Sequence, residues 1–171
     1  TRKMEDRYSG HLIAGNLLQG PAEDTGDQNI AATVTAAGVT SITTASMTVT
    51  ANQYAGGYVT VTVTPGLGTT YRIKSHAAYT GAAATFELEE PLQVALSASS
   101  RLDFYPNPYN GVIQNPASAS GPVVGVAVND ITAGQYGWIQ TAGPCNVLTD
   151  SGGVTVGAAV SASNAVAGAV E

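Results

Sequence analysis

The sequence is short of the residues that carry most protein chemistry. Its 171 residues include one cysteine, two histidines, six lysines and arginines, and twelve aspartates and glutamates, so charged residues make up 11% of the chain. A typical domain has about 25%. The single cysteine excludes an intrachain disulfide and with it the small secreted disulfide scaffold. No apolar run approaches the roughly 20 residues of a membrane-spanning helix.

The charge balance argues against two classes of partner. The formal net charge is −6, and the basic residues form no single patch: Arg2, Lys3, Arg7, Arg72, Lys74 and Arg101. Nucleic-acid binding needs a clustered basic face that neutralises several phosphates. We therefore expect no nucleic-acid partner and no anionic membrane surface. The N-terminus lacks the apolar core of a signal peptide, so we expect the protein to be made in a cytoplasm.

Small and β-branched residues dominate the rest of the chain, which favours strands and tight turns over helices. Turn signals at regular intervals separate about ten to twelve short strands, and no long segment has a helical period. We predict an all-β fold, a sandwich or barrel of antiparallel strands. The clearest alternation runs over 58–64, and further strands are predicted within 30–51 and over 70–75, 85–89, 94–96, 101–105, 112–113, 145–149 and 154–160, with a loop over 76–84.

A hairpin is predicted over residues 121–144, around which the C-terminal half is organised. Val124, Val126 and Val128 alternate with small residues, and turn chemistry follows at Asn129-Asp130 and Ala133-Gly134. In the second strand Tyr136, Trp138 and Gln140 share one side, with Ile139 on the other. Trp138 is the sole tryptophan, and a tryptophan in such a strand can bury a large apolar area while its N–H finds one partner.

This stretch resembles the small virion structural proteins of tailed bacteriophages, most of all head decoration (cement) proteins. The residues concerned are Val-Gly-Val-Ala at 124–127 and Gly-x-Tyr-Gly-Trp-Ile-Gln-Thr-x-Gly-Pro at 134–144, before a valine-rich segment. The similarity covers roughly residues 90–171. It implies a β-rich module, often trimeric, that binds the major capsid protein on the outside of a capsid and belongs to the virion. It transfers no functional residue.

Residues 1–29 differ from the rest and are interpreted as an extended N-terminal arm, followed by a β-domain over 30–171 with a possible subdivision near 115–120. The arm has scattered charges and glycines and one apolar cluster: Leu12, Ile13, Leu17 and Leu18. Ordering such a segment costs entropy, so it needs a surface to hold it. This surface is either a neighbouring subunit, which makes the cluster a partner-binding site, or the domain itself, which makes it a first strand or a short helix.

Tyrosine is unusually common for a chain with only two phenylalanines. Tyrosine is favoured where its ring contacts apolar groups and its hydroxyl meets water, as at protein interfaces. Tyr105 and Tyr109 flank a loop stiffened by Pro106 and Pro108, so they are predicted contact residues; the alternative is packing over the edge of a sheet.

The candidates for catalysis and metal binding are weak. A zinc site needs three or four ligands, and His11, His76 and Cys145 are scattered. Cys145 is interpreted as a small inward-facing strand residue because no spacing supports a base for a nucleophile. We predict no enzyme, no metal and no cofactor.

Acidic residues supply two further weak candidates. Glu87 and Glu89 share a strand face and could act as a carboxylate pair, although a solvated acidic face is the better interpretation. Asp103, Asp130 and Asp150 sit in or beside turns, where aspartate caps its own backbone, and they lack the spacing of a calcium loop.

The resulting hypothesis is a structural virion protein that binds and stabilises the exterior of a phage capsid as a homo-oligomer, with a trimer favoured. The alternatives are another virion component (a shell, tail-tube or fibre domain) and a carbohydrate-binding or adhesion β-module.

Overall fold

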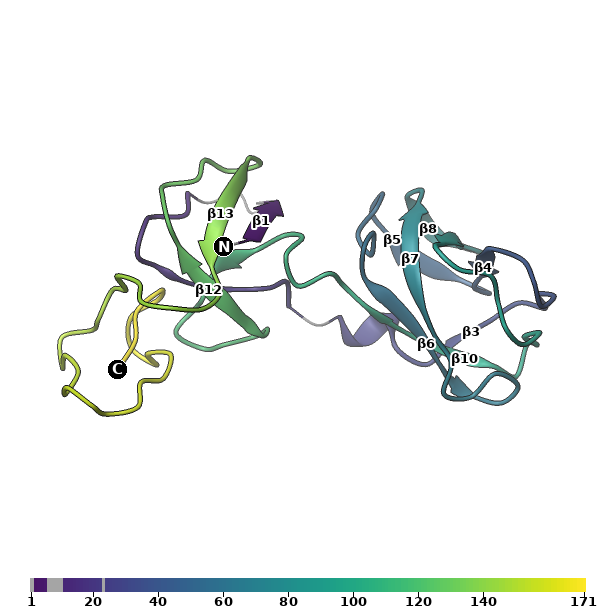
Figure 1. Ribbon diagram of the computed structural model, residues 1–171. Helices are drawn as coiled ribbons and strands as arrows, with labels where there is room; N and C mark the ends of the chain where they lie inside the picture. The colour runs from purple at the N-terminus through teal and green to yellow at the C-terminus, as the bar shows by residue number, and fades with distance from the viewer. Residues whose placement is uncertain (1, 6–10, 23) are drawn as a thin grey trace. The chain divides into compact units, whose positions relative to one another are not determined.

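The computed structural model describes residues 2–5, 11–22 and 24–171, and the chain forms two compact units. Unit 1 combines residues 1–22 and 108–171, while unit 2 is the continuous stretch 23–107 (Figure 1). Among the described residues every strand pair is antiparallel, and one 3-10 turn, η1 (Thr25–Asp27), is the sole helical element. The predicted all-β class is confirmed. Residues 115–120 lie inside unit 1.

Unit 2 is built on a six-stranded curled sheet. Its order is β3 (Ile30–Ala31), β10 (Arg101–Tyr105), β6 (Tyr58–Val63), β7 (Thr70–His76), β9 (Thr85–Leu88) and β4 (Ser41–Thr43). Two hydrogen bonds link the ends of the two outer strands, β3 and β4. Thr33 N, just after β3, donates to Thr43 O of β4 at 2.8 Å, and Ala45 N, just after β4, donates to Ala31 O of β3 at 2.8 Å. A separate pair, β5 (Met47–Val49) and β8 (Tyr79–Ala82), completes the unit.

The alternation of side chains explains how these strands bury one face. Val59 and Val61 of β6 are fully buried, whereas Thr60 faces outward and its hydroxyl lies 3.0 Å from that of Thr70 on β7. The same inward pattern holds at Tyr71 and Ile73 of β7, and at the apolar positions Phe86, Leu88, Leu102 and Phe104 of β9 and β10. The strands predicted over 58–64, 70–75, 85–89 and 101–105 are therefore confirmed, with Val63 exposed at the end of β6.

Unit 1 contains a five-stranded sheet in the order β1 (Arg2–Glu5), β13 (Tyr136–Gln140), β12 (Val123–Ala127), β2 (Leu17–Gln19) and β11 (Ile113–Gln114). Strand β2 lies between β12 and β11, which both come from the second stretch of unit 1, residues 108–171. The buried cluster below it is small and aliphatic: Leu12, Leu18, Val112, Ala127, Ile131 and Ile139.

The predicted hairpin is present as β12 and β13. Ile139 is fully buried and Gly137 faces the same side, where an added Cβ would lie 2.1 Å from Ile131 Cδ1. Trp138 points the other way and is 52% exposed. The predicted division of β13, with Trp138 on one side and Ile139 on the other, is confirmed, and the buried side is the one that packs against Ile131.

A backbone irregularity at Gly125 breaks the valine alternation in β12. The pairing with β2 shifts register between Val123 and Gly125, and Gly125 has φ +147°. Val124 packs with the cluster around Leu12, whereas Val126 packs on the opposite side with Leu17 and Val170. The three valines predicted to share one face are therefore divided, as a β-bulge requires.

Several strand predictions were wrong. Residues 79–82, predicted as loop, form β8, while Leu96 and Thr149 make only isolated bridges. Residues 154–160 form no strand, and Val156 is fully exposed. Alternation shows which side chains could share a face, but a ladder also needs a neighbouring strand, and the described residues place none beside this segment.

Gly125→Ala is expected to destabilise unit 1 strongly. An alanine Cβ would lie 2.4 Å from Gln140 O, a backbone atom in the neighbouring strand, and the positive φ adds strain. We expect a loss of about 3 kcal/mol, measured by urea unfolding followed by Trp138 fluorescence. The matched control is Gly134→Ala, which has φ +76° but no atom within 4 Å of the added Cβ, with an expected loss of about 1 kcal/mol. Equal losses in the two variants would contradict this role of Gly125.

Candidate functional site

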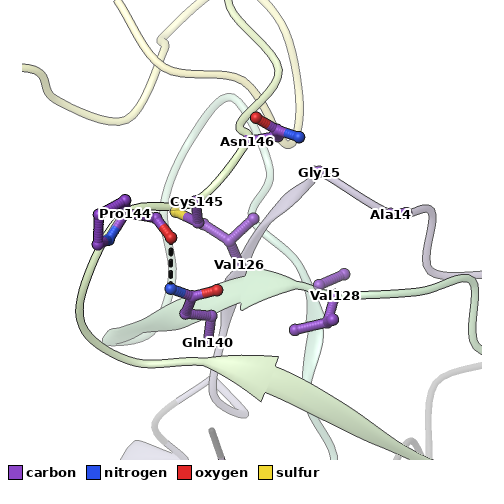
Figure 2. Close-up of a pocket in the computed structure, with 9 residues that line it drawn as sticks. Ala14, Gly15, Val126, Val128, Gln140, Pro144, Cys145 and Asn146 are labelled. Atoms are coloured by element: carbon purple, nitrogen blue, oxygen red, sulfur yellow. Dashed lines mark hydrogen bonds between the residues drawn. The ribbon is translucent and has the colours of Figure 1, made fainter.

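Unit 1 carries a depression of about 550 Å³ beside the hairpin (Figure 2). Its floor comes from the end of β12, and one wall comes from Gln140 of β13 together with the loop that follows. The other side is the chain just before β2. The lining residues are Ala14, Gly15, Val126, Ala127, Val128, Gln140, Pro144, Cys145 and Asn146.

Hydrogen bonds between the surrounding segments fix the shape of this depression. Gly15 N donates to Ala127 O at 2.9 Å, and Gly15 O accepts from Leu148 N at 2.8 Å, so residue 15 joins β12 to the loop. The Gln140 amide donates to Ala142 O at 3.1 Å and to Pro144 O at 2.6 Å (Figure 2). These bonds hold the 141–146 loop against the sheet without any charged group.

The depression continues into an exposed row on the outer side of the hairpin. Tyr136, Trp138 and Gln140 alternate along this side of β13, and the two aromatic residues are 60% and 52% exposed. Gln140 pairs with Val126, and Val128 N donates to Trp138 O at 3.2 Å, so Val128 lies beside Trp138. We call Val126, Val128, Tyr136, Trp138 and Gln140 the hairpin face. Its five members carry no charge, and the neighbouring strand β1 places Lys3 and Glu5 at the positions that pair with Trp138 and Tyr136.

Cys145 is exposed, which corrects the prediction of an inward-facing strand residue. It lies in the loop after β13, and none of the nine lining residues is a histidine, a carboxylate or a base. A cysteine nucleophile needs a base and a group that orients this base. The lining instead offers apolar contacts and the side-chain amides of Gln140 and Asn146.

The predicted apolar cluster of the arm is divided by the fold. Leu12, Leu17 and Leu18 are buried within unit 1, and only Ile13 is exposed. Leu17 and Leu18 belong to β2, and Leu12 bridges to Ile131. Of the two interpretations of this cluster, the structure corresponds to a first strand that packs on its own domain. Residues 6–10 of the arm lie outside the described residues.

The two predicted contact tyrosines belong to different units. Tyr105 of β10 is 42% exposed in unit 2 and lies opposite the exposed Tyr58 on β6. Tyr109 is half-buried in unit 1 and packs on the cluster around Leu12. Edge packing, the alternative considered for both residues, thus describes Tyr109 better than Tyr105.

The histidines and acidic residues occupy separate structural positions. His11 lies 3.7 Å from Asp130 at the surface, and His76 is buried in unit 2. Across residues 2–5, 11–22 and 24–171 no group of three potential ligands could hold a metal ion. Glu87 is exposed on β9, and Glu89 lies 3.6 Å from Arg72.

The three aspartates cap backbone amides, but two of them do so at long range. Asp150 caps its own turn by accepting from Gly152 N at 3.0 Å. Asp130 accepts from Ala14 N at 2.8 Å and Asp103 from Asn29 N at 2.7 Å. The predicted capping role is confirmed, whereas the prediction that each caps its own turn is wrong for Asp103 and Asp130.

Comparisons with protein-family models, curated proteins and solved structures found no match to this chain. Within the part of the chain that the structure describes, no helix has the length and hydrophobicity to cross a membrane.

Sequence reasoning missed the hairpin face because alternation does not say which side is buried. One signal was present: Gly137 stands between Tyr136 and Trp138, in line with Ile139. A glycine on one side of a strand marks the side where another chain segment approaches closely. Here this segment carries Ile131, so the aromatic side had to face outward.

Cys145 should react with a thiol reagent in the folded protein, because it is exposed. We expect one maleimide per chain without denaturant, at the rate of a small exposed thiol, as measured by mass spectrometry. The Cys145→Ser variant is the control for labelling at other groups. Labelling only after unfolding would show that the loop covers this side chain.

Proposed function

We propose that this chain is a structural virion protein that binds the exterior of a phage capsid lattice and stabilises it. The hairpin face is the observation that carries this proposal: half-exposed Trp138 and Tyr136 lie beside an uncharged depression. Exposed aromatic residues on a sheet face are typical of the centres of protein–protein contacts. The resemblance to decoration proteins names the partner, the major capsid protein.

The energetics favour a contact that is repeated many times. Covering the exposed parts of Trp138, Tyr136 and Val128 at about 25 cal/mol per Å² contributes a few kcal/mol per chain. Association entropy offsets much of this. A trimer places three hairpin faces on one lattice site, which raises the effective affinity without new contacts. Binding only to the assembled shell then stabilises the shell by mass action.

A capsid-binding measurement tests this function. Capsids assembled without this protein should bind the purified chain to saturation at a fixed copy number, and their melting temperature should rise. Trp138→Ala should weaken binding by about ten- to a hundredfold, because it removes the largest exposed apolar side chain of the face. Trp138 fluorescence should shift to shorter wavelength as the ring leaves water.

Tyr105→Ala is the comparison variant, since it removes an exposed aromatic residue from unit 2. Unchanged binding assigns the contact to the hairpin face, whereas loss of binding in this variant alone moves the contact to the predicted site at Tyr105. Failure of the unaltered chain to bind the capsids rejects the decoration function. A copy number equal to that of the shell, tail-tube or fibre subunit supports the alternative of another virion component.

The same face supports a second candidate function, a module that binds neutral carbohydrate. Tyr136 and Trp138 are two residues apart on one strand face, a spacing of about 7 Å. Aromatic rings at such a spacing can stack on the C–H faces of neighbouring sugar rings. The side-chain amides of Gln140 and Asn146 at the depression can bond hydroxyl groups without any charge.

A glycan array with neutral oligosaccharides tests the second candidate. Expected is a hit that quenches or shifts Trp138 fluorescence on titration and that Trp138→Ala abolishes. Trp138→Phe is the matched variant, because it keeps an aromatic face and should retain part of the affinity. If the array gives no hits and the chain binds capsids, the carbohydrate-binding function is rejected and the decoration function is supported.

A further inference from the structure

Unit 2 contains a buried group of ionisable side chains that the proposed function does not use. Asp27 of η1, Tyr54 of the turn 50–57 and His76 at the end of β7 are each at most 6% exposed. They lie beside two aromatic rings, with the His76 ring centroid 4.6 Å from that of Phe86 and the Tyr54 ring 5.5 Å from Phe104. This cluster forms part of the unit's core.

The hydrogen bonds of His76 define its protonation state. Tyr54 N–H donates to His76 Nε2 at 3.0 Å, and His76 Nδ1 lies 2.9 Å from Ala77 O. A backbone N–H only donates and a carbonyl oxygen only accepts. Nε2 must therefore be unprotonated and Nδ1 must carry the proton, so this imidazole is neutral and is the Nδ1–H tautomer.

His76 also organises the turn 50–57. Its backbone N donates to the Asn52 side chain at 3.0 Å, and its carbonyl accepts from Asn52 N at 3.1 Å. Gly56 N donates to Ile73 O of β7 at 2.8 Å. The hydrogen bond from Tyr54 N to the imidazole lies between these contacts, so several residues of the turn are bonded to β7. The turn in this position places the Tyr54 ring in the core.

A proton on Nε2 would turn its acceptor into a donor that faces the Tyr54 N–H, and it would bury a cation beside Phe86. Among the described residues, the charged and titratable groups near this position include Asp27 from η1 and Tyr54 from the turn, with Asp24 next to Asp27. The Tyr54 hydroxyl donates to Asp27. Burial raises the pKa of Asp27, which makes this carboxyl group harder to ionise.

We propose that neutral His76 is an acid-sensitive latch that holds the turn 50–57 on β7, and that protonation of its imidazole releases this turn. The closed form then binds fewer protons than the open form, so opening becomes more favourable as the pH falls. The effect begins where an exposed histidine takes up a proton, near pH 6.5. The raised pKa of Asp27 acts with the opposite sign, because the closed form holds that proton more firmly. Opening in acid therefore cannot come from Asp27.

Hydrogen exchange across a pH series tests the latch. Expressed as protection factors, protection of the Tyr54 amide should fall by up to tenfold per pH unit below about 6.5. Amides of β6 and β10 should keep their protection. His76→Gln cannot titrate and should show no such slope, whereas His11→Gln, which alters the other histidine at the surface, should behave like the unaltered chain.

A measurement on the unaltered chain decides the question even if His76→Gln does not fold. Nitrogen NMR of the His76 ring at pH 8 should show the tautomer with the proton on Nδ1. The proposal is overturned by the Nε2–H tautomer, by protonation of His76 without any change at the Tyr54 amide, or by an equal slope in folded His76→Gln.

Discussion

The pairing of β2 with both β12 and β11 is the interaction on which unit 1 depends. Leu18 and Gln19 are fully buried in the middle of a sheet whose other strands, apart from β1, come from beyond residue 108. Gln19 uses its side chain as well: its amide donates to the Ser120 hydroxyl at 2.9 Å and accepts from Ser120 N at 3.2 Å. Without β2, β12 and β11 would share no partner, and the depression would lose the wall formed by Ala14 and Gly15.

The scarcity of charge has a different consequence in each unit. In unit 2 Arg72 and Glu89 lie on the outer side of the sheet, while Asp27 and His76 are buried beside Tyr54 in the core. In unit 1 the five residues of the hairpin face are uncharged, and the nearest charges along the sheet are Lys3 and Glu5 of β1, which pair with Trp138 and Tyr136.

The sequence predicted the parts of the fold that depend on local pattern. β6 and β7 alternate cleanly and pair with each other, so Val59 and Tyr71 were placed correctly from their own neighbours. The errors and omissions concern long-range information. The side of β13 that is buried depends on Ile131, the irregularity at Gly125 depends on the register with β2, and the segment around Val156 stays irregular because the described fold offers it no adjacent strand. The candidate site was missed for the same reason, since its wall at Gly15 lies far from β12 in sequence.

The chain order of the two units dictates a sequence of events during synthesis. Unit 2 is one uninterrupted stretch, so its sheet becomes complete once residue 107 has left the ribosome. The strands β1 and β2 emerge earlier but must wait for β11, β12 and β13, the last of which ends at Gln140. During this interval Leu12, Leu17 and Leu18 are solvent-exposed hydrophobic groups on a nascent polypeptide. We therefore expect any chaperone that assists folding to bind the segment around these leucines before residues 108–140 have been made.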